Sequence, residues 1–193
     1  MTTLSTSPFI VDSIWQKTRT SAIAQVTSLT VLTIVSAQII IPLPFTPIPL
    51  TMQTFAILFG AAAIGPSKAL IAQVTYIFLA TLGLPILAGD KGGIESVLGA
   101  TGGYLFAFLV ASVVVGKLAS TISTKRFRGV LLGYVLGSLI IYAIGATWLA
   151  IYTGKGLSYA FLNGVLPFLV GDVIKAALAA SLLPAAWRLV KNN

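Results

Sequence analysis

Long apolar runs, interrupted by glycine, proline and a few charged residues, dominate the chain. A run of about 20 apolar residues has the length that an α-helix needs to cross the hydrocarbon core of a bilayer. The pattern predicts six transmembrane helices, at residues 20–41, 51–64, 68–82, 104–122, 130–152 and 167–188. The second and third are short and are separated only by a Gly-Pro-Ser turn, which predicts a tight helical hairpin.

The composition agrees with a membrane protein. Hydrophobic residues make up 57% of the 193 residues and charged residues only 8%, whereas a soluble domain has about 25% charged residues. We therefore expect an all-α integral membrane protein with one transmembrane domain over residues 1–193. Residues 1–19 lack the apolar core of a cleaved signal peptide and are expected to be a cytoplasmic N-terminal segment.

The basic residues are divided unequally between the two sides of this predicted bundle. Six crossings place both termini and the connections at 65–67 and 123–129 on one side. Nine of the twelve basic residues fall there: Lys17, Arg19, Lys68, Lys117, Lys125, Arg126, Arg128, Arg188 and Lys191. The other side has three basic residues and three of the four acidic residues: Lys91, Lys155, Lys175, Asp90, Glu95 and Asp172.

Cytoplasmic loops of membrane proteins carry an excess of lysine and arginine, so this asymmetry predicts that both termini are cytoplasmic. Trp15 and Trp187 fall where an inner aromatic belt is expected. The net charge of +8 is explained by topology, and we expect no nucleic-acid partner.

The composition also excludes several kinds of chemistry. Cysteine and histidine are both absent, which excludes disulfides, Cys/His catalysis and ordinary zinc sites. The segment 60–68 resembles a phosphate loop, but its lysine follows the serine and it joins two membrane helices. We expect no catalytic residues, no metal site and no ATPase activity in the chain itself.

Two connections on the predicted outer side have unusual compositions. Residues 42–50 contain four prolines, which forbid a helix and indicate a stiff, uncharged strap. Residues 84–103 are rich in glycine and contain Lys91, a cation that could neutralise a ligand carboxylate. A flexible surface loop is the alternative interpretation of this second connection.

Asp172 and Lys175 lie three residues apart within the last apolar run. Ionisable groups at such depth are costly and mark functional sites by default. If Pro167 occupies the first helical position, the two residues lie roughly 8 and 12 Å along the helix and share one face. A carboxylate accepts N–H donors and an ammonium donates to a carbonyl, so together they complement a cyclic urea or amide. The alternatives are a self-contained ion pair, or an aspartate that complements the helix dipole.

Two further polar residues are candidate companions of this pair. Gln53, near the outer end of the second predicted helix, offers both a donor and an acceptor, although it could equally bridge two helices. Tyr104, at the outer end of the fourth, could stack on an apolar ring or could be an ordinary interfacial tyrosine.

Small residues at four-residue spacing permit close contact between membrane helices. Gly133 and Gly137 in the fifth predicted helix are expected to pack inside the bundle. Ala24 and Ser28 in the first could pack internally or could receive a helix from a partner protein.

A series of separate motifs, in order along the chain, resembles the BioY family, the biotin-specific S component of energy-coupling factor (ECF) transporters. The motifs are PLPFTPIPLTMQTF at 42–55, GLP at 83–85, KGG at 91–93, GATGGY at 99–104 and PFLVGDVIK at 167–175. The resemblance implies six helices, a biotin pocket near the outer face, and a bacterial cell (inner) membrane location. It also implies a transmembrane T component and two ABC-type ATPase subunits as partners, with biotin as the transported ligand and no cofactor.

The resemblance assigns roles to individual residues. Gln53, Asp172 and Lys175 look like the polar residues around the ureido ring, and Tyr104 looks like a pocket aromatic. Lys91 resembles the basic residue that meets the valerate carboxylate, where many relatives have arginine with its bidentate fork. The family's Ala-x3-Ala signature for docking the T component is represented by Ala24-x3-Ser28.

The resemblance therefore predicts a protein for biotin uptake that is not an enzyme. A stand-alone facilitator or secondary transporter for a small polar-ring solute is the alternative. An intramembrane enzyme would have only Asp172 and Lys175 as buried candidates, and a purely structural scaffold does not explain the polar outer face.

Overall fold

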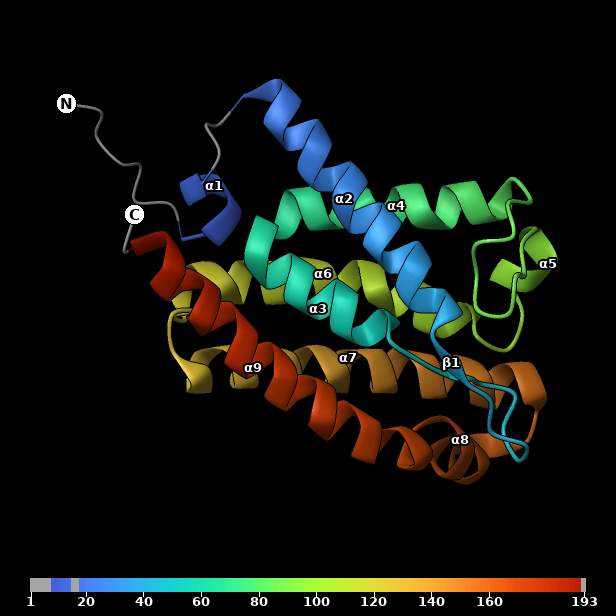
Figure 1. Ribbon diagram of the computed structural model, residues 1–193. Coiled ribbons are helices and arrows are strands. Elements are labelled where there is room, and N and C mark those ends of the chain that lie inside the picture. Colours follow the sequence, from blue (N-terminus) through green and yellow to red (C-terminus); the bar gives the residue numbers. More distant parts are fainter. Residues whose placement is uncertain (1–7, 15–17, 192–193) are drawn as a thin grey trace.

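The computed structural model describes residues 8–14 and 18–191 of the chain (Figure 1). Their helices are α1 (Ile10–Ile14), α2 (Arg19–Gln38), α3 (Gln53–Ile64), α4 (Pro66–Thr81), α5 (Ile94–Val97), α6 (Gly102–Thr121), α7 (Phe127–Thr153), α8 (Gly156–Gly164), the 3₁₀ helix η1 (Leu166–Phe168) and α9 (Leu169–Lys191). Two short strands, β1 (Ile40–Ile41) and β2 (Leu50–Thr51), pair antiparallel at the base of the proline-rich strap.

Local sequence explains where several helices begin and end. The Thr18 side chain accepts a hydrogen bond from the Ser21 N–H and caps α2. Gly65, with φ of +90°, separates α3 from α4, and Pro66 opens α4 at a position where its missing N–H costs nothing. The predicted tight hairpin of two short helices is therefore present. Gly154 adopts the left-handed conformation that ends α7.

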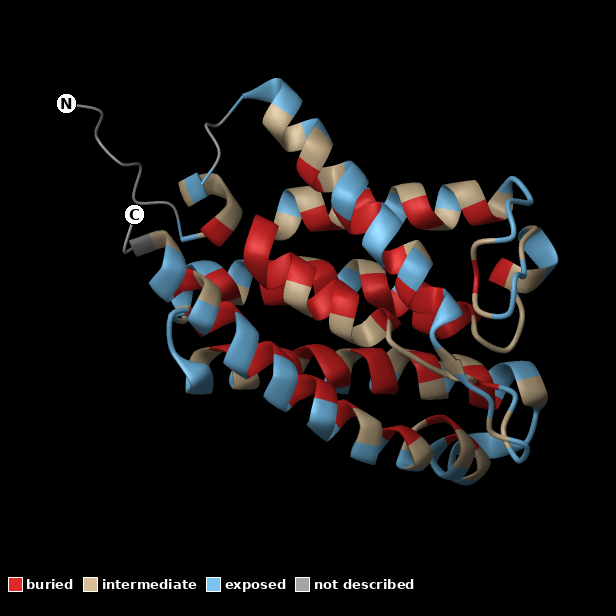
Figure 2. Cartoon of the chain, viewed as in Figure 1, coloured by how far each residue is buried: buried red, intermediate tan, exposed pale blue. Residues whose placement is uncertain are grey.

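Helix α3 lies at the centre of the bundle, against α6, α7, α9 and α2, and is almost wholly buried (Figure 2). Small residues allow the close contacts around it. A Cβ added to Gly137 of α7 would lie 2.6 Å from a methyl of Leu58 in α3 and 2.8 Å from a methyl of Val115 in α6. The prediction that the glycine pair in this helix packs internally is confirmed for Gly137.

The two ends of the bundle differ in the elements that close them. Helix α1, the α3–α4 turn and the α6–α7 connection lie at one end, whereas the strap, α5 and α8 lie at the other (Figure 1). We call these the α1 end and the strap end. The helices therefore alternate in direction in the order that the sequence predicts.

The predicted number of membrane spans is supported only in part. Helices occur at all six predicted places, but four segments of the described chain are long and apolar enough to cross a membrane: Arg19–Gln38, Gly102–Thr121, Phe127–Thr153 and Gly156–Val190. Helices α3 and α4 have 12 and 16 residues. At about 1.5 Å per residue they extend roughly 18 and 24 Å, less than the ~30 Å of a hydrocarbon core.

Two predicted connections contain helices. Residues 153–166, which separate the fifth and sixth predicted helices, contain α8, and the glycine-rich connection 84–103 contains α5. Pro167 was expected to open the last helix, but it lies in η1 and α9 begins two residues later at Leu169. Asp172 is therefore in the first turn of α9, closer to the helix N-terminus than predicted.

The expected inner aromatic belt is not formed by Trp187. Its side chain is buried, its indole N–H donates to the Thr124 hydroxyl at 3.1 Å, and the Lys125 ammonium lies 4.6 Å from the ring centroid. The Trp187 side chain therefore joins α9 to the α6–α7 connection and does not face lipid. Trp15 and Lys17 lie outside the described residues.

Candidate functional site: a pocket beneath the strap

A pocket of about 820 Å³, including its open mouth, lies at the strap end. Its walls come from the strap, α3, α4, α6, α7 and α9, together with the segment that links α4 to α6. All five residues that the sequence nominates for ligand binding line this one pocket: Gln53, Lys91, Tyr104, Asp172 and Lys175. Residues from distant parts of the chain thus converge on a single cavity.

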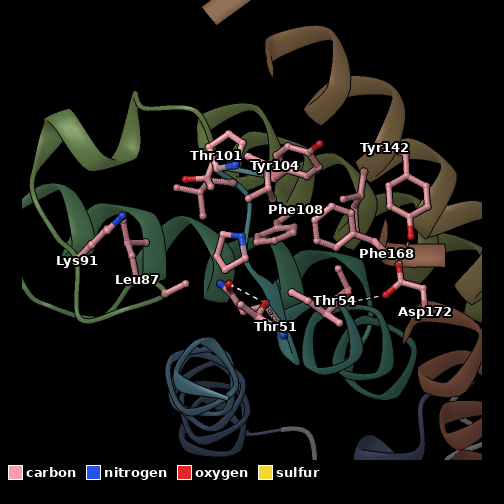
Figure 3. Close-up of a pocket in the computed structure, with 18 of the residues that line it drawn as sticks. Thr51, Thr54, Leu87, Lys91, Thr101, Tyr104, Phe108, Tyr142, Phe168 and Asp172 are labelled. Carbon is pink, nitrogen blue, oxygen red and sulfur yellow. Dashed lines mark hydrogen bonds between the residues drawn. The ribbon is translucent and has the colours of Figure 1, made fainter. Parts of the chain in front are cut away.

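The pocket has a charged residue at each end, and aromatic rings and neutral polar side chains line the stretch between them. Asp172 and Lys91 lie at opposite ends in Figure 3, and the rings of Tyr104, Phe108 and Phe168 lie between them. This layout suits an elongated ligand with a polar group at each end.

Asp172 and Lys175 are 6% and 5% exposed, and the Lys175 Nζ lies 2.8 Å from the Asp172 Oδ1. The Thr54 hydroxyl donates to the same oxygen at 3.2 Å and accepts from Lys175 at 2.9 Å. The Tyr142 hydroxyl donates to the other carboxylate oxygen, Oδ2, at 2.5 Å. Three donors therefore hold the carboxylate from α3, α7 and α9.

The alternatives drawn from the sequence for this pair are both visible in the structure. The ion pair is formed, and Asp172 also lies where the positive end of the α9 dipole stabilises a negative charge. Neither contact seals the pair from the pocket, because both side chains line it. An ammonium has three donors, and Lys175 uses two of them on acceptors of the described chain, Thr54 and Asp172. One N–H remains for a ligand carbonyl.

Gln53 opens α3 directly below the strap and is buried. Its Nε2 donates to the Tyr76 hydroxyl at 3.0 Å, and its Oε1 accepts from the Thr51 hydroxyl at 3.2 Å. These contacts hold the amide plane against the pocket wall. Gln53 thus both lines the pocket and bridges two helices, which unites the two interpretations that the sequence allowed.

Tyr104 is buried between α6 and α7, and its hydroxyl donates to the Gly164 carbonyl at 2.7 Å. A Cβ on Gly145 would lie 2.4 Å from the ring, so this glycine makes the space that the ring occupies. Because its hydroxyl is already paired, Tyr104 presents mainly its ring to the pocket.

Lys91 is exposed at the mouth of the pocket, on a turn closed by a hydrogen bond from the Leu87 N–H to the Lys91 carbonyl at 2.9 Å. Gly89 and Asp90 within this turn have φ of 75° and 55°. The glycine-rich connection is therefore a structured turn followed by a short helix.

Sequence reasoning missed three residues that shape the polar end: Thr54, Tyr76 and Tyr142. Thr54 follows Gln53 directly, and a hydroxyl beside a nominated residue was a usable signal. The tyrosines had none, because a single tyrosine in an apolar helix does not reveal which distant residue it meets.

The candidate docking residues lie away from the pocket, on α2. Ala24 is half-buried and Ser28 is exposed. The two residues are thus accessible, at least in part, on the surface of the described structure.

The sequence profile of the BioY family matches residues 7–192. The chain belongs to the BioY family. Among named BioY relatives, the probable biotin transporter BioY of Pyrococcus horikoshii is 40% identical over 148 residues, covering 77% of this chain and 85% of its own. The biotin transporter BioY of Thermotoga maritima is 38% identical over 151 residues, covering 78% and 86%.

A solved structure is similar to this BioY chain over most of its length. The crystal structure of the S-component for biotin from an ECF-type ABC transporter superposes with a TM-score of 0.82 and 26% sequence identity. The match covers 90% of this chain and 94% of the other. BioY proteins are multi-pass membrane transporter components and not enzymes, which removes the intramembrane enzyme from the alternatives.

Proposed function

We propose that this BioY protein binds biotin in the pocket beneath the strap and serves biotin uptake as the S component of an ECF-type ABC transporter. The observation that carries the proposal is the buried Asp172–Lys175 pair at one end of a pocket whose mouth bears Lys91. The names of the curated relatives and of the solved S-component for biotin support the same ligand.

Biotin has a ureido ring at one end and a carboxylate at the other, joined by apolar atoms. In our proposal one ureido N–H donates to the acceptor site that remains on the Asp172 carboxylate, and the ureido oxygen accepts from the free N–H of Lys175 and from Gln53. The apolar part of the ligand lies against Tyr104, and the carboxylate reaches Lys91. Lysine supplies charge without the two-pronged geometry of arginine, so this contact constrains the carboxylate less.

Uptake requires partners that supply energy, and we propose a transmembrane T component and two ABC-type ATPase subunits. Ala24 and Ser28 on α2 are our candidate contacts for the T component, because small residues let another helix approach closely. We further propose a single transmembrane domain in which six helices cross the membrane, α3 and α4 included, with both termini in the cytoplasm. The excess of basic residues at the α1 end supports this orientation.

Isothermal titration of the purified protein with biotin tests the ligand, with thiamine and riboflavin as controls. We expect heat only with biotin, and release of biotin if the protein is purified loaded and then denatured. No heat and no released biotin would refute the assignment. Uptake by cells with and without T component and ATPases separates an S component from a stand-alone facilitator, because a facilitator needs neither partner.

A further inference from the structure

Two side chains of the bundle hold the turn that carries Lys91. The Tyr76 hydroxyl donates to the Ile86 carbonyl at 3.2 Å. The Gln38 amide donates to the same carbonyl at 3.3 Å and to the Leu87 carbonyl at 3.1 Å. The start of the turn is therefore fixed from both α2 and α4.

The Tyr76 hydroxyl also contacts Gln53 on α3. It accepts the Gln53 Nε2–H at 3.0 Å, and the whole tyrosine is 0% exposed while lining the cavity. A hydroxyl has one proton, so accepting from Gln53 leaves that proton for Ile86. One atom thus connects a residue proposed to face the ureido ring with the segment proposed to meet the carboxylate.

The turn transmits its position to Lys91 because it is short and closed. Leu87 and Lys91 are joined across it by a backbone hydrogen bond of 2.9 Å. Its far end is anchored as well, since the Gly93 N–H donates to the Ala80 carbonyl at 2.7 Å. A Cβ on Gly92 would lie 2.3 Å from the Leu84 carbonyl oxygen, so the two arms of the loop cross in contact. The Leu87–Lys91 hydrogen bond therefore couples the position of Ile86 to that of the Lys91 backbone.

We infer that Tyr76 is a positioning residue, acting through the Ile86–Lys91 turn, that makes the pocket select ligands with a carboxylate. The inference rests on the proposed function. Gln38 also holds the Ile86–Lys91 turn. It does so from outside the pocket, since it is exposed and does not line the cavity. Tyr76 thus acts as a specificity determinant without itself contacting the ligand carboxylate.

Comparing biotin with biotin methyl ester tests this, because the ester keeps the ring and chain but lacks the charge. The readout is the ratio of the two dissociation constants for each variant, measured by calorimetry in the full-length protein. The parent should prefer biotin over the ester. Tyr76→Phe, which keeps the ring volume, should weaken biotin more than the ester and reduce this preference by about three- to tenfold, as expected for a displaced charge-assisted contact.

Gln38→Leu should reduce the preference in the same direction while leaving the buried core intact, which provides a second measurement if Tyr76→Phe does not fold. Thr75→Val is the matched control on α4, because among the described residues its hydroxyl bonds only within its own helix, to the Ile71 carbonyl. In a Lys91→Ala background, Tyr76→Phe should leave the already reduced preference unchanged.

Three outcomes would overturn the inference. Equal weakening of biotin and ester by Tyr76→Phe would show that Tyr76 acts only through Gln53 at the ring end. Equal binding of the two ligands by the parent would show that no carboxylate contact exists to be positioned. A further loss of preference in the Lys91→Ala background would show that Tyr76 acts without Lys91. Failure of the parent to bind biotin at all refutes the proposed function instead.

Discussion

Asp172→Asn removes the negative charge at the polar end of the pocket while keeping the size of the side chain. The carboxylate accepts hydrogen bonds from Lys175, Thr54 and Tyr142. An asparagine has one acceptor oxygen, so its amide nitrogen must face one of these donors or the ligand. Losing a charge-assisted hydrogen bond to biotin should cost about 2 kcal/mol, or roughly 30-fold in dissociation constant.

The same substitution leaves the Lys175 ammonium buried without its counter-ion. Breaking a buried pair from one side costs about 3 to 5 kcal/mol, so the thermal unfolding temperature in detergent should fall together with the affinity. A double variant, Asp172→Asn with Lys175→Met, removes both charges and separates the two effects. We expect this double variant to regain much of the lost stability and still to bind biotin weakly.

Calorimetry and thermal unfolding of the parent, single and double variants form the complete assay. If the double variant regains biotin affinity together with stability, the pair is structural and contributes nothing specific to the ligand. A single variant that binds biotin within about twofold of the parent would contradict the proposed contact in a simpler way.

Further predictions concern the mouth, the strap and the packing. Lys91→Arg should tighten biotin binding a few-fold because a guanidinium can pair bidentately with a carboxylate, and Lys91→Ala should weaken it; unaltered calorimetric affinity in both would exclude a carboxylate contact. Thr46→Val removes the 2.6 Å hydrogen bond from the strap to the Asn163 carbonyl and should speed biotin release in stopped-flow measurements, whereas an unchanged rate would show that the strap does not limit release. Gly137→Ala places a methyl against Leu58 and should lower the unfolding temperature by an amount equivalent to about 1 to 3 kcal/mol. An unchanged temperature would mean that α3 and α7 move apart to accept the methyl group at no cost in stability.

Much of the helical framework could be predicted from the chain alone. The places of six helices (α2, α3, α4, α6, α7 and α9), the α3–α4 hairpin and the division of the connections between two ends follow from apolar runs and turn residues. The errors occurred where the pattern is ambiguous. Helix α8 was missed because its nine residues are too few to span a bilayer, and Pro167 suits a 3₁₀ turn as well as a helix start.

The charged residues of the candidate site, together with Gln53 and Tyr104, could be nominated from the sequence, whereas Tyr76 and Tyr142 could not. Asp172 and Lys175 are conspicuous because charge is costly in an apolar run. The hydroxyl groups of Thr54 and Tyr142, which hold the carboxylate, carry no such cost, and only Thr54, beside Gln53, had a local signal. They lie 118 and 30 residues from Asp172 in sequence, so only the packing of α3 and α7 against α9 brings them together.

The sequence by itself determined that this is a helical membrane protein, where six of its helices lie and where its isolated charges are, because apolar length, turn residues and the cost of buried charge act locally. The tertiary structure alone decided which polar atoms meet. It forms the hydrogen bonds that join the strap to α8, Tyr142 to the Asp172 carboxylate, and Tyr76 to the turn that carries Lys91. Such contacts join segments that are distant in the chain, and their partners are selected by how the helices pack rather than by any pattern within one helix.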